Sequence, residues 1–206
     1  ILTAITARLA NRALETSVQE RLVQIASARS TQLESYAAER VRDGTTLSIA
    51  PTVVTAMSQL SSVGLSASNP TILEEEATAY APYLRDVATS RGYESLLLIH
   101  VDGTVLYSST DQLKPGARLT SESLGTTELA KSFDRSRTLL QSEMCQFAPF
   151  GKAGTPTAFV TSPIFQKEKV VGVLALQLPI DRVWQILTDT TGLGETGEIL
   201  TAERID

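Results

Sequence analysis

Residues 151–179, GKAGTPTAFVTSPIFQKEKVVGVLALQLP, decide how this chain is expected to fold. Two runs rich in Val, Ile, Phe and Leu flank a charged turn at residues 166–169, and Gly and Pro punctuate the outer ends, which predicts a β-hairpin. The composition of the loop sets the register, so that Phe165 faces Val170. Because side chains alternate along a strand, this register assigns every other residue to one of two faces.

The two predicted faces differ in character. One face is small and partly polar, which suits the wall of a concave site. It comprises Ala158, Val160, Ser162, Val173, Ala175 and Gln177. The other face is bulky and suits packing against a helix. It comprises Phe159, Thr161, Leu174, Leu176 and Leu178. We therefore expect the bulky face to meet a helix and the small face to meet a ligand.

Composition limits the classes of protein to consider. With 206 residues, 42% of them hydrophobic and 20% charged, the chain fits one domain or one domain plus a fragment. The net charge of −5 provides no basic surface for nucleic acid. The single cysteine, Cys145, lies in an apolar run and is interpreted as a small buried residue. No apolar run reaches the ~18 residues of a membrane span.

Residues 1–43 contain neither Gly nor Pro, which predicts one long amphipathic helix that ends at Gly44. Its apolar stripe is Leu14, Val18, Leu22, Ile25, Leu33 and Tyr36. At about 1.5 Å per residue the helix would extend about 60 Å, which is more than a domain of this size needs. Either it packs only on its own sheet, or its lower part pairs with a second copy and leads to a membrane.

A second hairpin is expected at residues 93–109, YESLLLIHVDGTVLYSS. Its Asp-Gly pair favours a two-residue type I′ turn, which pairs Val101 with Thr104. The same register places His100 and Tyr107 on one face. Each hairpin is thus expected to have one apolar face and one face of mixed polarity.

The remaining segments are expected to be helices and one long connection. Pro51 and Pro70 each open a helix, and Gly92 closes the second. Residues 111–136 hold a long loop with a short helix, and a strand follows near residues 139–147. A connection of that length is typical of a lid or a binding loop.

A glycine pattern near the end of the chain could be mistaken for a cofactor site. Gly192, Gly194 and Gly197 have the G-x-G-x-x-G spacing that lets backbone amides approach a pyrophosphate. They follow a predicted helix at residues 179–188 and precede a strand, which is the reverse of a dinucleotide-binding turn. We therefore expect no cofactor.

Catalytic groups are sparse. His100 is the only histidine and has no neighbouring soft ligand for zinc, so no metal site is expected. There is no G-x-S-x-G motif, and a lone histidine in a strand is more often a core or pocket residue. We therefore expect that the chain is not an enzyme. A hydrolase that uses His100 is kept only as a formal third hypothesis.

The order of the predicted elements resembles that of the Cache family, the PAS-like extracytoplasmic sensor domains of bacterial chemoreceptors, histidine kinases and cyclases. The resemblance covers roughly residues 93–200 through four motifs. They are LLLIHVDGTVLYSSTDQLKPGARL, FAPFGKAGTPTAFVTSPIF, VVGVLALQLPIDRVWQIL and TGLGETGEIL. It implies an α+β fold, in which a PAS-like antiparallel sheet of about five strands has a long N-terminal helix on one face and a lid segment over the other.

The resemblance also implies an organisation. Residues 194–198 look like the junction between the two modules of double-module members, so the chain is expected to hold the membrane-distal module. The implied parts are a signalling helix (1–44), a sensor module (45–189) and a truncated junction (190–206). Members that bind amino acids carry Arg-x-Trp-Tyr in the lid, and LTSESLGTTELAKSFDRSR lacks both aromatics. Amino-acid specificity is therefore not carried over.

Together these patterns predict a small-molecule-sensing domain of a bacterial transmembrane receptor, outside the cytoplasm, that transmits ligand binding through its long helix. A polar or anionic ligand is expected between the mixed face and the lid. The expected contacts are His100, Tyr107, Ser162 and Gln177 on the sheet, and Arg118, Phe147 and Phe150 on the lid side. The expected partner is a second copy in a parallel homodimer, with the membrane reached only through flanking segments. The alternative is a helix-driven dimerisation or protein-interaction module with no small-molecule ligand.

Overall fold

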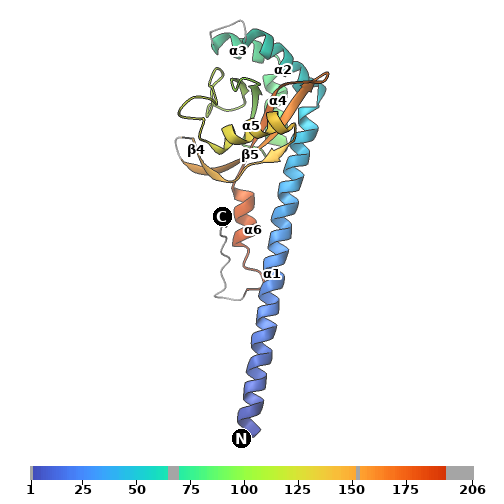
Figure 1. Ribbon diagram of the computed structural model, residues 1–206, viewed down its shortest axis with the longest axis vertical. Helices are drawn as coiled ribbons and strands as arrows, with labels where there is room; N and C mark the ends of the chain where they lie inside the picture. The colour runs from blue at the N-terminus through green and yellow to red at the C-terminus, as the bar shows by residue number, and fades with distance from the viewer. Residues whose placement is uncertain (1, 65–69, 152–153, 194–206) are drawn as a thin grey trace. The chain divides into compact units, whose positions relative to one another are not determined.

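The computed structural model of the chain describes residues 2–64, 70–151 and 154–193 (Figure 1). Its helices are α1 (Leu2–Ser48), α2 (Pro51–Gly64), α3 (Pro70–Ala77), α4 (Ala81–Ser90), α5 (Glu128–Leu139) and α6 (Asp181–Thr188). Its strands are β1 (Ser95–His100), β2 (Val105–Ser108), β3 (Glu143–Met144), β4 (Ala148–Phe150), β5 (Thr155–Gln166) and β6 (Lys169–Leu178). The predicted α+β class is confirmed.

The chain divides into two compact units, which are described separately. One unit, Ala37–Ile180, contains the last turns of α1, the helices α2 to α5 and all the strands. The other combines Ile1–Tyr36 with Asp181–Asp206, and its described part contains the rest of α1 together with α6. The predicted junction at residues 194–198 lies outside the described residues.

The sheet is antiparallel, with strand order β2-β1-β6-β5-β3 and with β4 paired to β5. The long hairpin β5-β6 pairs Phe165 with Val170 and Gln166 with Lys169. The predicted hairpin and the register of its turn are therefore confirmed.

A bulge follows directly after that turn. Ile164 pairs with Gly172 although the adjacent Phe165 pairs with Val170, so Val171 is an extra residue in β6. A single extra residue shifts every later pair by one and exchanges the faces of one strand relative to the other. The predicted division of β6 into two faces holds, but the predicted matching of β5 to β6 is wrong.

The two faces of the sheet carry different sets of side chains. The helix face carries Val160, Ser162, Leu174 and Leu176, with Leu96 and Leu98 from β1. The α5 face carries Phe159, Thr161, Ala175 and Gln177, with Leu97 and Ile99 from β1. Ser162 and Gln177, which the sequence predicts together, therefore lie on opposite faces.

The helix face is covered by the last turns of α1 and by α2. A Cβ added to Gly44 would lie 2.6 Å from both Ser162 Oγ and Val160 Cγ1, so α1 approaches the sheet closely at this glycine. Gly44 serves this approach and does not end the helix, which continues to Ser48. Leu174 and Leu176 lie on this face, as predicted.

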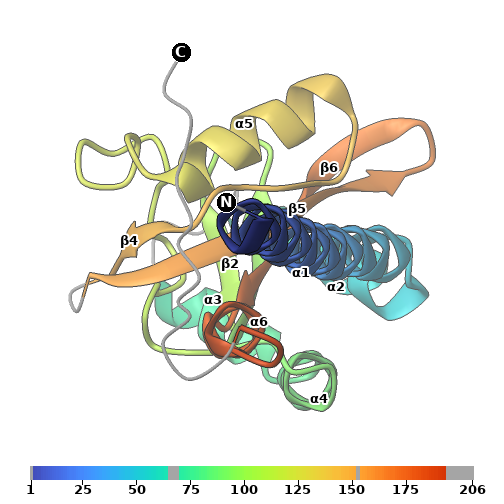
Figure 2. The ribbon, with the colours of Figure 1, turned by 90° about the horizontal axis from the view of Figure 1, so that it is seen from below.

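The α5 face is covered by α5, which Figure 2 shows along β5 and away from α3 and α4. The helix begins where the Thr127 hydroxyl accepts the Ala130 N–H at 3.2 Å, which caps it. Below it, Ser132 Oγ lies 2.6 Å from Thr161 Oγ1. Phe159 also lies on this face, so its predicted packing toward the long helix is wrong. The predicted lid over the face opposite the long helix is confirmed.

The β1-β2 hairpin closes through a three-residue loop. His100 N–H donates to the Thr104 carbonyl at 2.8 Å, and Gly103, at φ +87°, donates to the His100 carbonyl. The predicted two-residue turn is wrong, because a type I turn followed by a left-handed glycine fits an Asp-Gly pair equally well. Leu106 is then an extra residue in β2, and it leaves Tyr107 on the same face as His100, as predicted.

Cys145 is 4% exposed, as its apolar context predicts. Its Sγ accepts the Phe159 N–H at 3.1 Å. Burial raises the pKa of the thiol, which disfavours the reactive thiolate.

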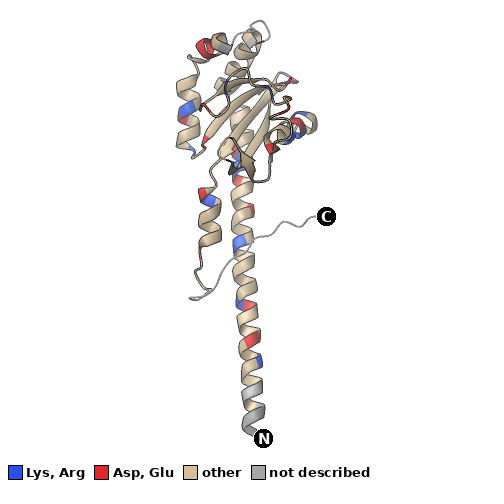
Figure 3. Cartoon of the chain, turned by 90° about the vertical axis from the view of Figure 1, so that its left-hand side faces the viewer, with Lys and Arg blue, Asp and Glu red and all other residues tan. Residues whose placement is uncertain are grey.

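In the second unit, the segment after α6 binds α1. Arg29 Nη2 lies 2.5 Å from Asp189 Oδ2 and donates to the Asp189 carbonyl at 3.0 Å. Figure 3 shows arginines interspersed with Asp and Glu along the described part of α1. Of the described helices, none has the length and apolarity to cross a membrane.

Candidate functional site

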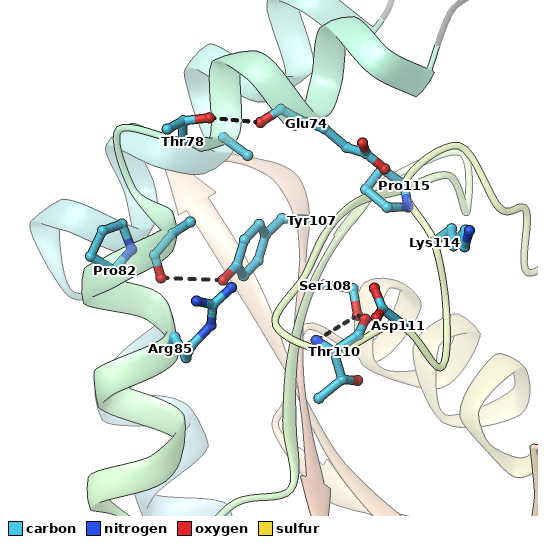
Figure 4. A pocket seen from close by; sticks show the side chains of 12 residues that line it. Glu74, Thr78, Pro82, Arg85, Tyr107, Ser108, Thr110, Asp111, Lys114 and Pro115 are labelled. Carbon is cyan, nitrogen blue, oxygen red and sulfur yellow. Dashed lines mark hydrogen bonds between the residues drawn. The ribbon is translucent and has the colours of Figure 1, made fainter.

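A cavity of about 440 Å³ lies between α3, α4, β2 and the loop after β2 (Figure 4). This volume falls within the range of about 300 to 1,000 Å³ that is usual for small-molecule sites. We call it the α4 cavity. It is lined by Glu74, Ala77, Thr78, Ala81, Pro82, Arg85, Tyr107, Ser108, Thr110, Asp111, Lys114 and Pro115.

A break between two helices creates one wall of the cavity. The sequence predicts a single helix from Pro70 to Gly92, but α3 ends at Ala77 and α4 begins at Ala81. Pro82 has no N–H to donate to the Thr78 carbonyl, so a continuous helix would lose a bond there. The break lets α3 and α4 each present side chains to the same cavity.

α4 places Arg85 in that wall. Leu84 and Ala88, four residues apart, are buried against the body of the unit. Arg85 lies next to Leu84 on the helix surface, and its guanidinium lies beside the Tyr107 hydroxyl (Figure 4). Among the described residues, the Arg85 side chain has no ion pair or hydrogen bond. Its positive charge is therefore available to a ligand.

Tyr107 supplies a hydroxyl at the base of the cavity. Its side chain is 4% exposed, and the hydroxyl donates to the Ala81 carbonyl over a long 3.4 Å. Burial raises the pKa of the phenol, and the charge of Arg85 opposes part of that rise. The phenol therefore stays protonated at neutral pH, and its single O–H can turn from the Ala81 carbonyl to donate to an anion.

The opposite wall carries charges of both signs. Asp111 and Lys114 come from the loop after β2, and Glu74 comes from α3. None of their side chains is in an ion pair with another described residue. At the start of this loop, Ser108 Oγ donates to the Thr110 carbonyl at 2.6 Å. The cavity thus combines an uncompensated guanidinium at one end with mixed charges and hydroxyls at the other.

Of the seven residues that the sequence predicts as ligand contacts, Tyr107 lines the α4 cavity. His100 and Arg118 meet instead at the β1-β2 loop, around Asp102. His100 Nδ1 lies 2.9 Å from Asp102 Oδ1, and Arg118 Nη2 lies 3.9 Å from Asp102 Oδ2. Burial alone would raise the pKa of the Asp102 carboxyl, but hydrogen bonds from Thr104 and His100 outweigh it and hold that pKa below its usual value.

The other predicted contacts lie elsewhere. The Ser162 hydroxyl is buried on the helix face beneath α1. Gln177, on the α5 face, donates to Glu94 Oε2 at 2.7 Å. The Phe150 ring packs edge-on against Phe159, with centroids 4.9 Å apart, and Phe147 is half-buried against the core. The structure therefore does not bring the seven residues into one wall, and their role in binding stays a prediction.

The sequence offered a partial signal for the residues that do line the cavity. Asp111 and Lys114 fall inside the motif that carries the family resemblance, immediately after Tyr107. Arg85 has no such signal, because its position depends on the break between α3 and α4. Across residues 2–64, 70–151 and 154–193, no group of three or more His, Cys, Asp or Glu side chains is placed to hold a metal ion.

No protein-family model and no curated protein sequence matches the chain. Several solved structures do. The sensor domain of the V. cholerae histidine kinase DctB superposes with a TM-score of 0.52 at 18% identity, covering 85% of this chain and 59% of that one. The E. coli DcuS sensor domain gives 0.51 at 15% identity, covering 76% and 97%. The ligand-binding domain of the Campylobacter jejuni chemoreceptor Tlp3, in complex with 4-methylisoleucine, gives 0.51 at 14% identity, covering 85% and 63%.

These neighbours are sensor and ligand-binding domains, and the chain shares their fold, which agrees with the PAS-like fold that its motifs suggest. The chain spans about three fifths of the DctB and Tlp3 structures. At these identities the likeness concerns the fold.

Proposed function

We propose that this chain is an extracytoplasmic small-molecule-sensing domain of a bacterial transmembrane signalling receptor, and that it passes ligand binding to its long N-terminal helix. The observation that carries the proposal is the α4 cavity, where the Arg85 guanidinium and the protonated Tyr107 hydroxyl face the same space. The likeness to sensor domains of a histidine kinase and a chemoreceptor supports it.

The chemistry of the cavity favours a polar ligand with at least one anionic group. A guanidinium forms short, charge-assisted hydrogen bonds with a carboxylate, and a neighbouring hydroxyl adds directionality. Signalling would be a shift of population toward the conformation that binds the ligand more tightly. Such coupling transmits only the difference in binding free energy between the two states, which is typically ~1–3 kcal/mol.

A ligand screen tests this proposal. The thermal midpoint of the chain is measured with organic acids, amino acids, amines and sugars, and each stabilising compound is then tested on Arg85→Ala and Tyr107→Phe. We expect Arg85→Ala to weaken binding of the stabilising compound by about tenfold or more, because it removes a hydrogen-bonded charge. Lys131→Ala is the matched control, since Lys131 is exposed on α5, away from the cavity, and pairs with Glu128. Compounds that stabilise both cavity variants as much as the native chain would show that the cavity is not the site.

The alternative, a helix-driven assembly module, is favoured by one observation. Three residues of the predicted stripe on α1 are large, apolar and exposed: Leu14 at 64%, Val18 at 48% and Leu22 at 47%. Apolar side chains that recur at steps of four form one face of a helix, and such a face suits a second helix. Assembly and sensing are compatible, since a parallel homodimer would join two copies of the helix that carries the signal.

A further inference from the structure

Four polar side chains join the last turns of α1 to the segment between α4 and β1. The Tyr93 hydroxyl donates to Asp43 Oδ2 at 3.0 Å, and Arg91 Nη1 lies 3.3 Å from Asp43 Oδ1. Arg40 donates to the Arg91 carbonyl at 3.2 Å, and its guanidinium lies 5.3 Å from the centre of the Tyr93 ring. We call these residues the Asp43 cluster.

Three of the four side chains are sheltered, whereas the Arg91 side chain is 41% exposed. Tyr93 is 4% exposed, and the side chains of Arg40 and Asp43 are 14% and 25% exposed. Burial and the neighbouring Asp43 raise the pKa of the Tyr93 phenol, against the opposing charge of Arg40. The hydroxyl therefore remains a donor at any physiological pH. Removal of one partner would leave the others poorly satisfied, which is costly in a sheltered site.

The cluster is continuous with the wall of the α4 cavity. α4 carries Arg85 in that wall and ends at Ser90, immediately before Arg91. A ten-residue helix moves as a rigid body over short distances, so a displacement at Arg85 is felt at its other end. Arg91 and Tyr93 are the residues at that end, and both hold the same carboxylate on α1.

We infer that the Asp43 cluster is the joint that couples the α4 cavity to the long helix. The inference rests on the proposed function, because it concerns how occupation of that cavity reaches α1. A group bound at Arg85 shifts α4 relative to the sheet, and Arg91 and Tyr93 shift with it. Asp43 then follows, because it is held by both. Asp43 and Tyr93 are thus positioning residues for signalling and do not touch the ligand.

A covalent occupant of the cavity tests the joint without the natural ligand. Ser108, which lines the cavity, is replaced in the variant Ser108→Cys and modified with N-ethylmaleimide, and mass spectrometry confirms a single adduct, because Cys145 is buried. Hydrogen–deuterium exchange is then compared with and without the adduct. We expect exchange in residues 81–93 and in residues 37–48 to change by about twofold or more.

The same measurement is repeated in Asp43→Asn and in Tyr93→Phe, which removes only a hydroxyl. In both backgrounds we expect the adduct to alter residues 81–93 as before but to leave residues 37–48 unchanged. Glu34→Gln is the control, since Glu34 lies on the same helix and accepts a hydrogen bond from Ser30, outside the cluster. It should behave as the native sequence does.

Two outcomes would overturn the joint. In one, the adduct does not change hydrogen exchange in residues 37–48 when Asp43 is intact. In the other, the adduct changes exchange in residues 37–48 of Asp43→Asn as much as it does with Asp43 present. Failure of the joint is separable from failure of the proposed function. The ligand screen reports whether a small molecule binds, and the adduct reports whether an occupied cavity reaches α1.

Discussion

Ser162 shows how one hydroxyl can be placed on the wrong side of a sheet by a sequence pattern. The sequence predicts it in a ligand site, whereas the structure buries it completely on the helix face, and its Oγ has no hydrogen-bond partner among the described residues. A buried hydroxyl without a partner destabilises the folded state, because its bonds to water are lost and not replaced.

Ser162→Ala is therefore expected to stabilise the chain. Removal of the unpaired hydroxyl should raise the free energy of unfolding by about 1 kcal/mol, seen as a thermal midpoint higher by about 2–4 °C. Thr161→Val, on the adjacent position, should instead destabilise the fold, because it breaks the 2.6 Å hydrogen bond with Ser132. A loss of stability in Ser162→Ala would mean that the hydroxyl has a partner.

Asp102 should make stability depend on pH in acid. Hydrogen bonds from Thr104 and His100 overcome burial and lower its pKa in the folded state, so the folded chain binds fewer protons there than the unfolded chain. This contribution is complete above the unfolded pKa near 3.8 and is lost as the pH falls through the lower folded value. Asp102→Asn should cost less than about 1 kcal/mol at pH 7, since the side chain is 42% exposed. The difference from the native chain should vanish at the acid end of a urea-unfolding series.

At the scale of elements, the two hairpins were predictable, but the length of the Asp-Gly loop and the bulges were not. Charged and Asp-Gly turns carry their own signal, so both hairpins and the pairing of Phe165 with Val170 could be predicted from sequence. The bulge at Val171 has no comparable signal, because an extra valine in a run of valines still fits a strand. One such residue exchanges the faces of β5, which is why Ser162 and Gln177 lie on opposite faces of the sheet.

Gly172 should be among the least replaceable residues of the sheet. A Cβ at this position would lie 2.1 Å from Met57 Cε and 2.4 Å from the Ile99 carbonyl oxygen, which belongs to the backbone and cannot turn away. Gly172→Ala is expected to cost about 3 kcal/mol or more in unfolding free energy, measured by urea titration.

Gly154→Ala is the matched control for that substitution. Nothing lies within 4 Å of a Cβ at Gly154, and its φ of +63° leaves only backbone strain, of about 1 kcal/mol. Equal losses in the two variants would argue against the close packing of α2 on the sheet.

At the scale of the whole molecule, the predicted α+β fold is confirmed, whereas the role of the seven predicted ligand contacts stays a prediction. The chain superposes on sensor domains with TM-scores of 0.51 to 0.52. The α4 cavity depends instead on where a helix breaks, and Pro82 alone does not reveal that Arg85 and Tyr107 will meet. A fold is encoded in many redundant positions, whereas a site depends on a few that have no redundancy.

The exposed stripe on α1 predicts concentration-dependent association. Leu22→Glu, combined with Leu14→Glu, should shift the chain toward monomer in light scattering, by about tenfold or more in dissociation constant, because two exposed apolar side chains that a helix pair would bury become charged. The double variant Gln19→Glu with Gln24→Glu, which also adds two negative charges, is the charge-matched control on the same helix. A native chain that stays monomeric at the highest concentration measured would contradict helix-driven assembly of this chain.

The bulge at Val171 also has a meaning for how such chains can diverge. Its side chain is only half-buried, so its identity is weakly constrained. Its presence is strongly constrained, since deletion would realign the hairpin and exchange the residues that β5 turns toward α1 and α5. Evolution should therefore conserve the number of residues between Phe165 and Gly172 more strictly than their chemistry. Insertions and deletions there, which leave composition almost untouched, should be rarer than substitutions.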